Sequence, residues 1–110
     1  MIYDVELIDE AENDLHNIYK YYAFKRREPR LAKKIYMQII NKLNTLNEMP
    51  FRYPVYQKEP WKSRNIHQVF VGSYCCFYLV TKNIVKIIRI LYGSMDLDAA
   101  LKKTKFNNFN

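Results

Sequence analysis

The stretch SRNIHQVFVGSYCCFYLVTKNIVKIIRILYGSMD, residues 63–96, decides the fold of this chain. It contains three runs rich in valine, isoleucine, tyrosine and phenylalanine, a composition typical of β-strands. The runs cover residues 65–71, 74–80 and 84–92. Gly72-Ser73 separates the first two runs and Lys82-Asn83 lies between the second and the third. Gly72 in the first turn position favours a type II′ hairpin. The stretch therefore predicts three strands that follow one another closely in a mostly antiparallel sheet.

Two amphipathic helices are predicted before this stretch. Asp9 is a candidate N-cap for the first helix, Glu12 lies where the partner of a capping box belongs, and the run FKRRE at residues 24–28 ends the helix. Pro29 suits the first turn of the second helix, and Pro50 stops it. Their apolar stripes are Ala11, Leu15, Ile18, Tyr19 and Tyr22 in the first helix, and Ala32, Ile35, Tyr36, Ile39, Leu43 and Leu46 in the second.

The predicted order of elements is β-α-α-β-β-β, because residues 2–7 alternate as a strand does before the first helix begins. This order predicts an α+β fold in which a helical hairpin packs on one face of a mostly antiparallel four-stranded sheet. Residues 49–63 read as an irregular loop, and residues 97–103 as one or two helical turns. We expect a single domain over residues 1–103 and a frayed tail over residues 104–110.

The composition indicates a basic protein with one hydrophobic core. Of 110 residues, 49% are hydrophobic, and 18 lysines and arginines against 11 acidic residues give a net charge of +7. A small basic domain attracts polyanions such as nucleic acid, the ribosome surface or an acidic protein, although the charge could also serve solubility alone. The chain shows no secretory segment and no apolar run long enough for a membrane span, so we expect a cytoplasmic protein without membrane contact.

Several kinds of chemistry are disfavoured by the sequence. The two histidines are far apart, and the adjacent Cys75 and Cys76 lack the spacing of metal ligands, so no metal site is predicted. The sequence has no glycine-rich phosphate loop and no serine elbow, so we expect neither a cofactor nor a hydrolytic triad.

A basic and aromatic cluster in the loop before the second strand is a candidate binding surface. Lys58, Lys62 and Arg64 lie close to Trp61, and cations beside stacking rings suit single-stranded RNA. The competing interpretation is a solvated loop that Trp61 anchors to the core. We favour this structural role for Trp61 itself. His67 follows in the strand and joins the candidates for target binding, because histidine is the residue type that changes charge near neutral pH, although a strand histidine is more often structural.

The last strand carries a further candidate, Tyr92. Strict alternation places Arg89 and Tyr92 on opposite faces unless the strand bulges or ends early. Arg89 is then expected to be a structural residue that pairs with Asp4 or Glu6. Tyr92 is a candidate catalytic acid or base, but a phenol is a weak acid and this role would need cations beside it.

Three stretches together resemble a known family. The opening strand followed by EAENDLHNIYKYY (residues 10–22), the junction LNEMPFRYP (residues 46–54) and residues 63–96 are similar to the RelE/ParE superfamily of bacterial toxins. The resemblance covers about residues 3–101. Each motif is weak alone, but their order and spacing together are fairly specific, and the order agrees with the elements predicted above.

The resemblance implies the toxin of a type II toxin–antitoxin system. RelE-like members cleave mRNA on the ribosome without a metal, whereas ParE-like members inhibit DNA gyrase. A cognate antitoxin is the implied partner, with a partly disordered segment that wraps the basic surface, and toxin and antitoxin can form a higher-order complex.

The site residues of the RelE-like members are only partly present here. The resemblance places Cys75 and Met95 where phosphate-binding arginines are expected. The tyrosine that it leads us to expect in the tail would fall near Leu101, where this chain has no tyrosine. Each lost electrostatic contact would remove about 3–4 kcal/mol of transition-state stabilisation.

The long helical hairpin and the GSMD ending look more like the ParE branch, so gyrase inhibition is the favoured interpretation. The alternative is a metal-independent mRNA endoribonuclease that uses Tyr92 with Arg64 and Lys62.

Overall fold

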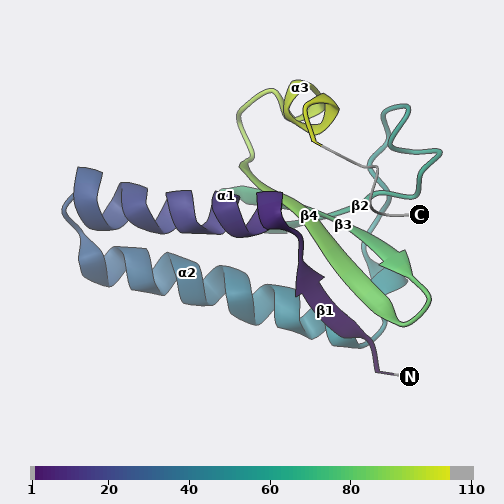
Figure 1. The fold of residues 1–110 in the computed structure, drawn as a ribbon, viewed down its shortest axis with the longest axis horizontal. Helices are drawn as coiled ribbons and strands as arrows, with labels where there is room; N and C mark the ends of the chain where they lie inside the picture. Colours follow the sequence, from purple (N-terminus) through teal and green to yellow (C-terminus); the bar gives the residue numbers. More distant parts are fainter. Residues whose placement is uncertain (1, 105–110) are drawn as a thin grey trace.

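The computed structural model describes residues 2–104, and its sheet has the strand order β1-β4-β3-β2 (Figure 1). The strands are β1 (Asp4–Leu7), β2 (His67–Val71), β3 (Tyr74–Thr81) and β4 (Ile84–Tyr92). β1 runs parallel to β4, and the other two pairs are antiparallel. The mostly antiparallel four-stranded sheet and the element order expected from the sequence are confirmed.

The helices form a long hairpin that extends beyond the sheet along the longest dimension of the molecule, 40 Å (Figure 1). The elements are α1 (Asp9–Lys20), the π-helical turn η1 (Tyr21–Lys25), α2 (Pro29–Asn44), the short turns η2 (Thr45–Asn47) and η3 (Pro50–Arg52), and α3 (Leu97–Lys102). Asp9 is the first helical residue and no side chain caps α1, so the expected N-cap was wrong. The preceding Ile8 instead continues the strand, since its N–H donates to the carbonyl of Ile87.

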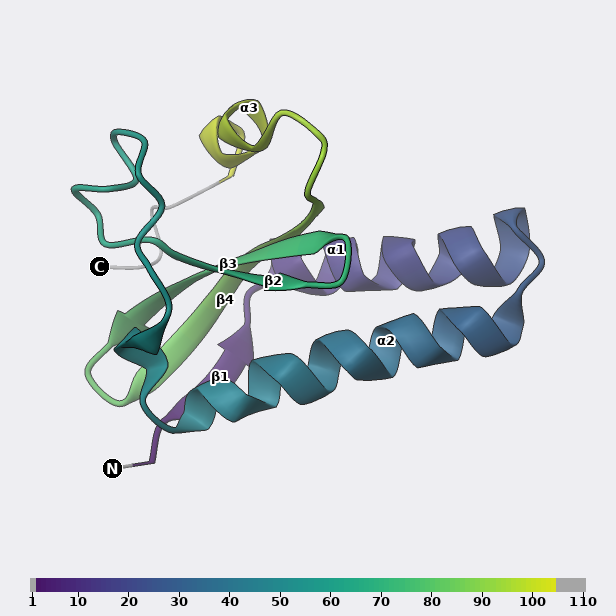
Figure 2. The same ribbon diagram turned by 180° about the vertical axis from the view of Figure 1, so that it is seen from behind.

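Both faces of the sheet are buried, each against a different partner. The hairpin covers one face, and its core includes Leu15, Ile39, Leu43, Tyr78 and Ile87. Helix α3 and the loop before β2 cover the other face, where Trp61, Phe77, Ile88 and Leu101 pack together. Figure 2 shows α3 on the side of the sheet away from α2. Burial on both faces explains why β3 reads as a continuous apolar run rather than an alternating one.

A β-bulge interrupts β4. Tyr78 pairs with Ile87, but the preceding Phe77 pairs with Arg89, so Ile88 is an extra residue in this strand. Beyond the bulge the alternation shifts by one, and Ile87 and Ile90 both belong to the core under the hairpin. Arg89 pairs with Phe77 and Tyr92 with Tyr74, which belong to the cores on opposite faces, so Arg89 and Tyr92 lie on opposite faces as expected. Both nevertheless line one cleft, at the edge of β4 beyond the last residue that pairs with β1.

The C-terminal segment follows α3 as far as Thr104. Thr104, the first residue of the expected frayed tail, is buried, and its hydroxyl donates to the carbonyl of Ala100. The remaining tail residues, 105–110, lie outside the described part of the chain. Of the helices within residues 2–104, none has the length and apolar character that crossing a membrane requires.

Candidate functional site

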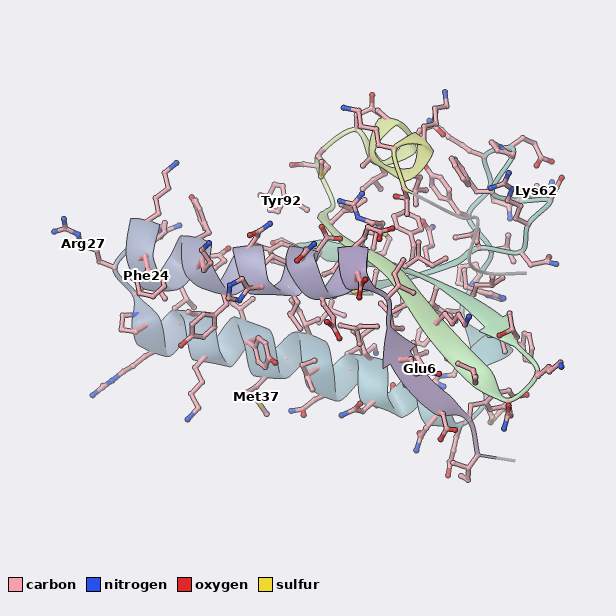
Figure 3. The ribbon with its side chains drawn as sticks, in the orientation of Figure 1. Glu6, Phe24, Arg27, Met37, Lys62 and Tyr92 are labelled. Atoms are coloured by element: carbon pink, nitrogen blue, oxygen red, sulfur yellow. The ribbon has the colours of Figure 1, made fainter. Side chains whose placement is uncertain are left out.

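A cleft of about 510 Å³ opens where the end of β4 meets the second half of α1. Its walls come from α1, η1, β3, β4 and the turn after β4. Tyrosine and arginine predominate among the polar lining residues, which include Tyr21, Tyr22, Tyr74, Tyr92, Arg26 and Arg89. We call this surface the tyrosine cleft. It contains Tyr92, the predicted catalytic candidate, and Figure 3 shows Tyr92 beside α1.

The tyrosines of the cleft contact one another. The Tyr92 side chain is 50% exposed, and its ring meets that of Tyr74 edge to face, with 5.8 Å between the ring centres. The hydroxyl of the buried Tyr74 donates to the hydroxyl of Tyr22 over 3.3 Å. Burial first, and then the hydrogen bond to Tyr22, raise the pKa of Tyr74 above its ordinary value. Tyr74 therefore stays neutral at physiological pH.

Asp14 of α1 organises the floor of the tyrosine cleft. Its carboxylate accepts hydrogen bonds from Nε and Nη2 of Arg89, at 2.7 and 2.9 Å, and from the backbone N–H of Ile90 at 2.9 Å. The expected pairing of Arg89 with Asp4 or Glu6 was wrong. β1 pairs with β4 only as far as Ile87, so α1 rather than β1 lies beside the second half of β4. Asp14 thus pairs the arginine and also satisfies a strand N–H beyond the end of β1.

The second arginine of the cleft is also engaged. Arg26 lies 3.3 Å from the carboxylate of Glu28, and its guanidinium lies 5.8 Å from the centre of the Tyr22 ring. The described lining residues include neither histidine nor lysine. The cleft therefore offers aromatic faces, hydroxyl groups and paired guanidinium groups, which suits the binding of a side chain or base better than proton transfer.

The positions at which the resemblance leads us to expect arginines do not contribute a cation to the cleft. Cys75 is fully buried on the sheet face opposite the hairpin, and burial raises the pKa of its thiol to about 11. Its neighbour Cys76 is buried on the other face, where burial raises the thiol pKa to about 12. Met95 lines the cleft and is 46% exposed.

The predicted basic cluster lies elsewhere. Lys62 and Tyr92 lie well apart (Figure 3). The guanidinium of Arg64 lies 5.7 Å from the centre of the Trp61 ring, and Lys58 contributes to the electrostatic environment of Asp98. Neither Arg64 nor Lys62 lines the tyrosine cleft. The predicted combination of Tyr92 with Arg64 and Lys62 is therefore not brought together.

His67 is a structural residue rather than part of an exposed target surface. It is buried, and its Nδ1 lies 2.8 Å from the carbonyl oxygen of Tyr53. Its ring stacks on Tyr78, with 5.1 Å between the centres and 16° between the planes. This burial disfavours the prediction that His67 binds the target, because the ring already packs within the protein.

Trp61 anchors the basic loop to α3, as the favoured interpretation of this residue expected. Its side chain is 3% exposed, and its indole N–H donates to a carboxylate oxygen of Asp98 over 2.8 Å. This hydrogen bond, followed by the contact with Lys102, lowers the pKa of Asp98. The anchor joins a loop and a helix that are 37 residues apart in the chain.

Acid is expected to weaken this anchor. Because the pKa of Asp98 is lowered in the folded state, its contribution to stability is complete above the unfolded value, about 4, and is lost as the pH falls through the folded value. Trp61 is the only tryptophan, so its fluorescence reports on the anchor. We expect an emission change below about pH 4 that is smaller in Asp98→Asn. Identical titrations of the two proteins would contradict this role.

The family model described as the ParE toxin of type II toxin-antitoxin system, parDE, matches residues 5–97. No curated protein matches the sequence. A solved chain from the chromosomal ParDE toxin–antitoxin system of P. aeruginosa has a TM-score of 0.69 and 18% identity, covering 83% of this chain and 96% of that one. A chain from the archaeal RelE-RelB complex of Pyrococcus horikoshii OT3 has a TM-score of 0.59 and 16% identity, covering 86% and 98%.

Proposed function

The chain belongs to the family of ParE toxins of type II toxin–antitoxin systems, and we propose that it arrests growth by inhibiting DNA gyrase. One observation favours gyrase inhibition over mRNA cleavage: the two arginines of the cleft that contains Tyr92 are already paired with carboxylates. Arg89 is held by two hydrogen bonds to Asp14, and Arg26 contacts Glu28. Stabilising a pentavalent phosphate requires cations directed at the phosphate, and here carboxylates already occupy them.

The residues at the two expected arginine positions support the same choice. Cys75 is buried away from the tyrosine cleft, and Met95 presents a thioether rather than a charge. The loop that carries Lys62 and Arg64 does not contribute to the cleft. A nucleolytic mechanism would therefore need both arginines of the cleft to leave their partners before they could contact a phosphate.

The partner that neutralises the toxin is a cognate antitoxin. The P. aeruginosa chain comes from a ParDE system and the archaeal chain from a RelE-RelB complex, so both similar structures belong to toxin–antitoxin pairs. The net charge of +7 favours an antitoxin whose toxin-binding segment is acidic. Co-expression of that antitoxin should restore growth.

Induction of the toxin in a bacterial host tests the proposed function. We expect growth arrest, loss of negative supercoiling in a reporter plasmid, and intact translated mRNA by primer extension. The variant Tyr92→Phe removes the hydroxyl of the candidate catalytic residue, and it should arrest growth as the wild type does. Cleavage of mRNA at ribosome-occupied codons that is lost in Tyr92→Phe would instead establish the RelE-like alternative.

A further inference from the structure

Residues 20–34 are the densest positively charged segment of this protein. Residues 20–34 contain seven of the 18 lysines and arginines and one of the 11 acidic residues, so these 15 residues carry a net charge of +6. By contrast, residues 1–19 contain six acidic residues and no lysine or arginine. The basic residues are Lys20, Lys25, Arg26, Arg27, Arg30, Lys33 and Lys34. Residues 35–110 carry 11 basic and four acidic residues, a net charge of +7 over 76 residues, so their positive charge is spread much more thinly.

The fold places this segment at the outer end of the helical hairpin. Residues 20–34 comprise the last residue of α1, the turn η1, the connection and the first turns of α2, and we call this segment the hairpin tip. Figure 3 shows Arg27 and Phe24 there, at the end of the molecule opposite Glu6. All seven basic side chains are exposed. The tip therefore projects a concentrated positive charge away from the sheet.

Most of these cations lack an acidic partner. Within the described part of the chain, Arg26 alone among the seven forms an ion pair, with Glu28. Arg30 has Lys33 and Lys34 three and four residues later, where like charges on one helix repel each other. A solubilising surface does not require this segregation, because charge spread over the molecule would serve equally well. The arrangement indicates a polyanionic ligand.

Aromatic rings accompany the charges. Phe24 is 71% exposed, the highest value for an aromatic ring within residues 2–104, and Tyr21 is 44% exposed. An exposed phenylalanine among cations contributes little to the core and provides a face on which a planar group can stack. Bases offer free faces in single strands, whereas a duplex keeps them stacked. This combination favours single-stranded nucleic acid over a duplex or an acidic protein.

We propose that the hairpin tip binds single-stranded nucleic acid, with its lysines and arginines on the phosphates and a base stacked on Phe24. The surface lies outside the basic loop of Lys58, Lys62 and Arg64, and it is distinct from gyrase inhibition. It meets the tyrosine cleft through Tyr21 and Arg26, which line the cleft as well. A strand bound at the tip could therefore continue toward Tyr92 along exposed aromatic surface.

Fluorescence anisotropy with labelled oligothymidylate and oligouridylate of about 12 nucleotides tests this proposal. The tip variant is Lys25→Ala, Arg30→Ala and Lys33→Ala combined, and the control variant is Lys82→Ala, Lys102→Ala and Lys103→Ala combined, three exposed lysines outside the tip and outside the basic loop. Three lost phosphate contacts should weaken binding about 100-fold at 0.1 M salt and lower the slope of log K against log salt by about 2. The control variant removes the same charge and should change affinity by less than about threefold.

Phe24→Ala separates stacking from charge. It should weaken binding about fivefold to 100-fold without changing the salt slope, and a duplex of the same length should bind more weakly than the single strand. Equal losses in the tip and control variants would overturn the proposal, as would an unchanged affinity in Phe24→Ala. Binding of polyglutamate but not of either oligonucleotide would also overturn it and would identify a surface for an acidic protein.

Discussion

Replacement of Asp14 by alanine is expected to lower the free energy of unfolding by about 3–5 kcal/mol. The Asp14 and Arg89 side chains are only 14% and 18% exposed, so removing the carboxylate leaves a largely buried guanidinium without its counterion. It also leaves the N–H of Ile90 without its acceptor. Both losses occur at the floor of the tyrosine cleft. Urea unfolding monitored by circular dichroism measures the effect.

Two further variants make this prediction specific. Lys102→Ala removes an exposed ion pair with Asp98 and should cost less than about 1 kcal/mol. Combining Asp14→Ala with Arg89→Met removes both charges and should recover part of the loss, because an apolar pair can replace a buried ion pair. A cost below about 1 kcal/mol for Asp14→Ala would show that the pairing contributes little to the fold.

Replacement of Trp61 by alanine should also destabilise the protein by about 3–5 kcal/mol. The indole is 3% exposed and packs with Phe77, Ile88 and Leu101 in the core beneath α3. Its removal leaves a cavity and deprives Asp98 of its hydrogen-bond donor. The loss should therefore free both the basic loop and α3 from the sheet. Thermal and urea unfolding by circular dichroism provide the measurement.

Aromatic substitutions of different burial serve as controls for Trp61. Trp61→Phe keeps most of the packing and should cost clearly less than Trp61→Ala. Phe24→Ala removes a ring that is 71% exposed and should cost less than about 1 kcal/mol. Similar unfolding free energies for Trp61→Ala and Phe24→Ala would contradict the assignment of Trp61 to a core.

The fold could be predicted from sequence because its signals are local. The turn at Gly72 and the closely spaced apolar runs specify the strand meander, and Pro29 and Pro50 delimit the second helix. The pairing of β1 with β4 is long-range. Once the three following strands form a meander, however, few positions in the sheet remain available to a strand that precedes a helical hairpin. What local patterns did not reveal was the cover on the second face, where Trp61 meets α3.

The arrangement of the cleft could not be predicted because it depends on one inserted residue in β4 and on where β1 stops pairing with that strand. The bulge at Ile88 leaves no mark in a run of isoleucines, yet it places Arg89 on the sheet face opposite the hairpin and Tyr92 on the face beneath the hairpin, and both line the cleft at the edge of β4. The role of Asp14 could not be predicted either. From sequence, a carboxylate on a helix cannot be told from a solvent-exposed one until the strand that lies beside the helix is known. The tyrosine pair at positions 21 and 22 was the one available signal.

A supercoiling assay with purified DNA gyrase tests the central claim most directly. Relaxed plasmid, gyrase and ATP are incubated with the purified toxin, with its Tyr92→Phe variant, and with toxin premixed with its antitoxin. The account predicts loss of supercoiling with the toxin and with Tyr92→Phe, and full supercoiling when antitoxin is present. Undiminished supercoiling at a toxin concentration that produces cleavage of ribosome-bound mRNA would contradict it.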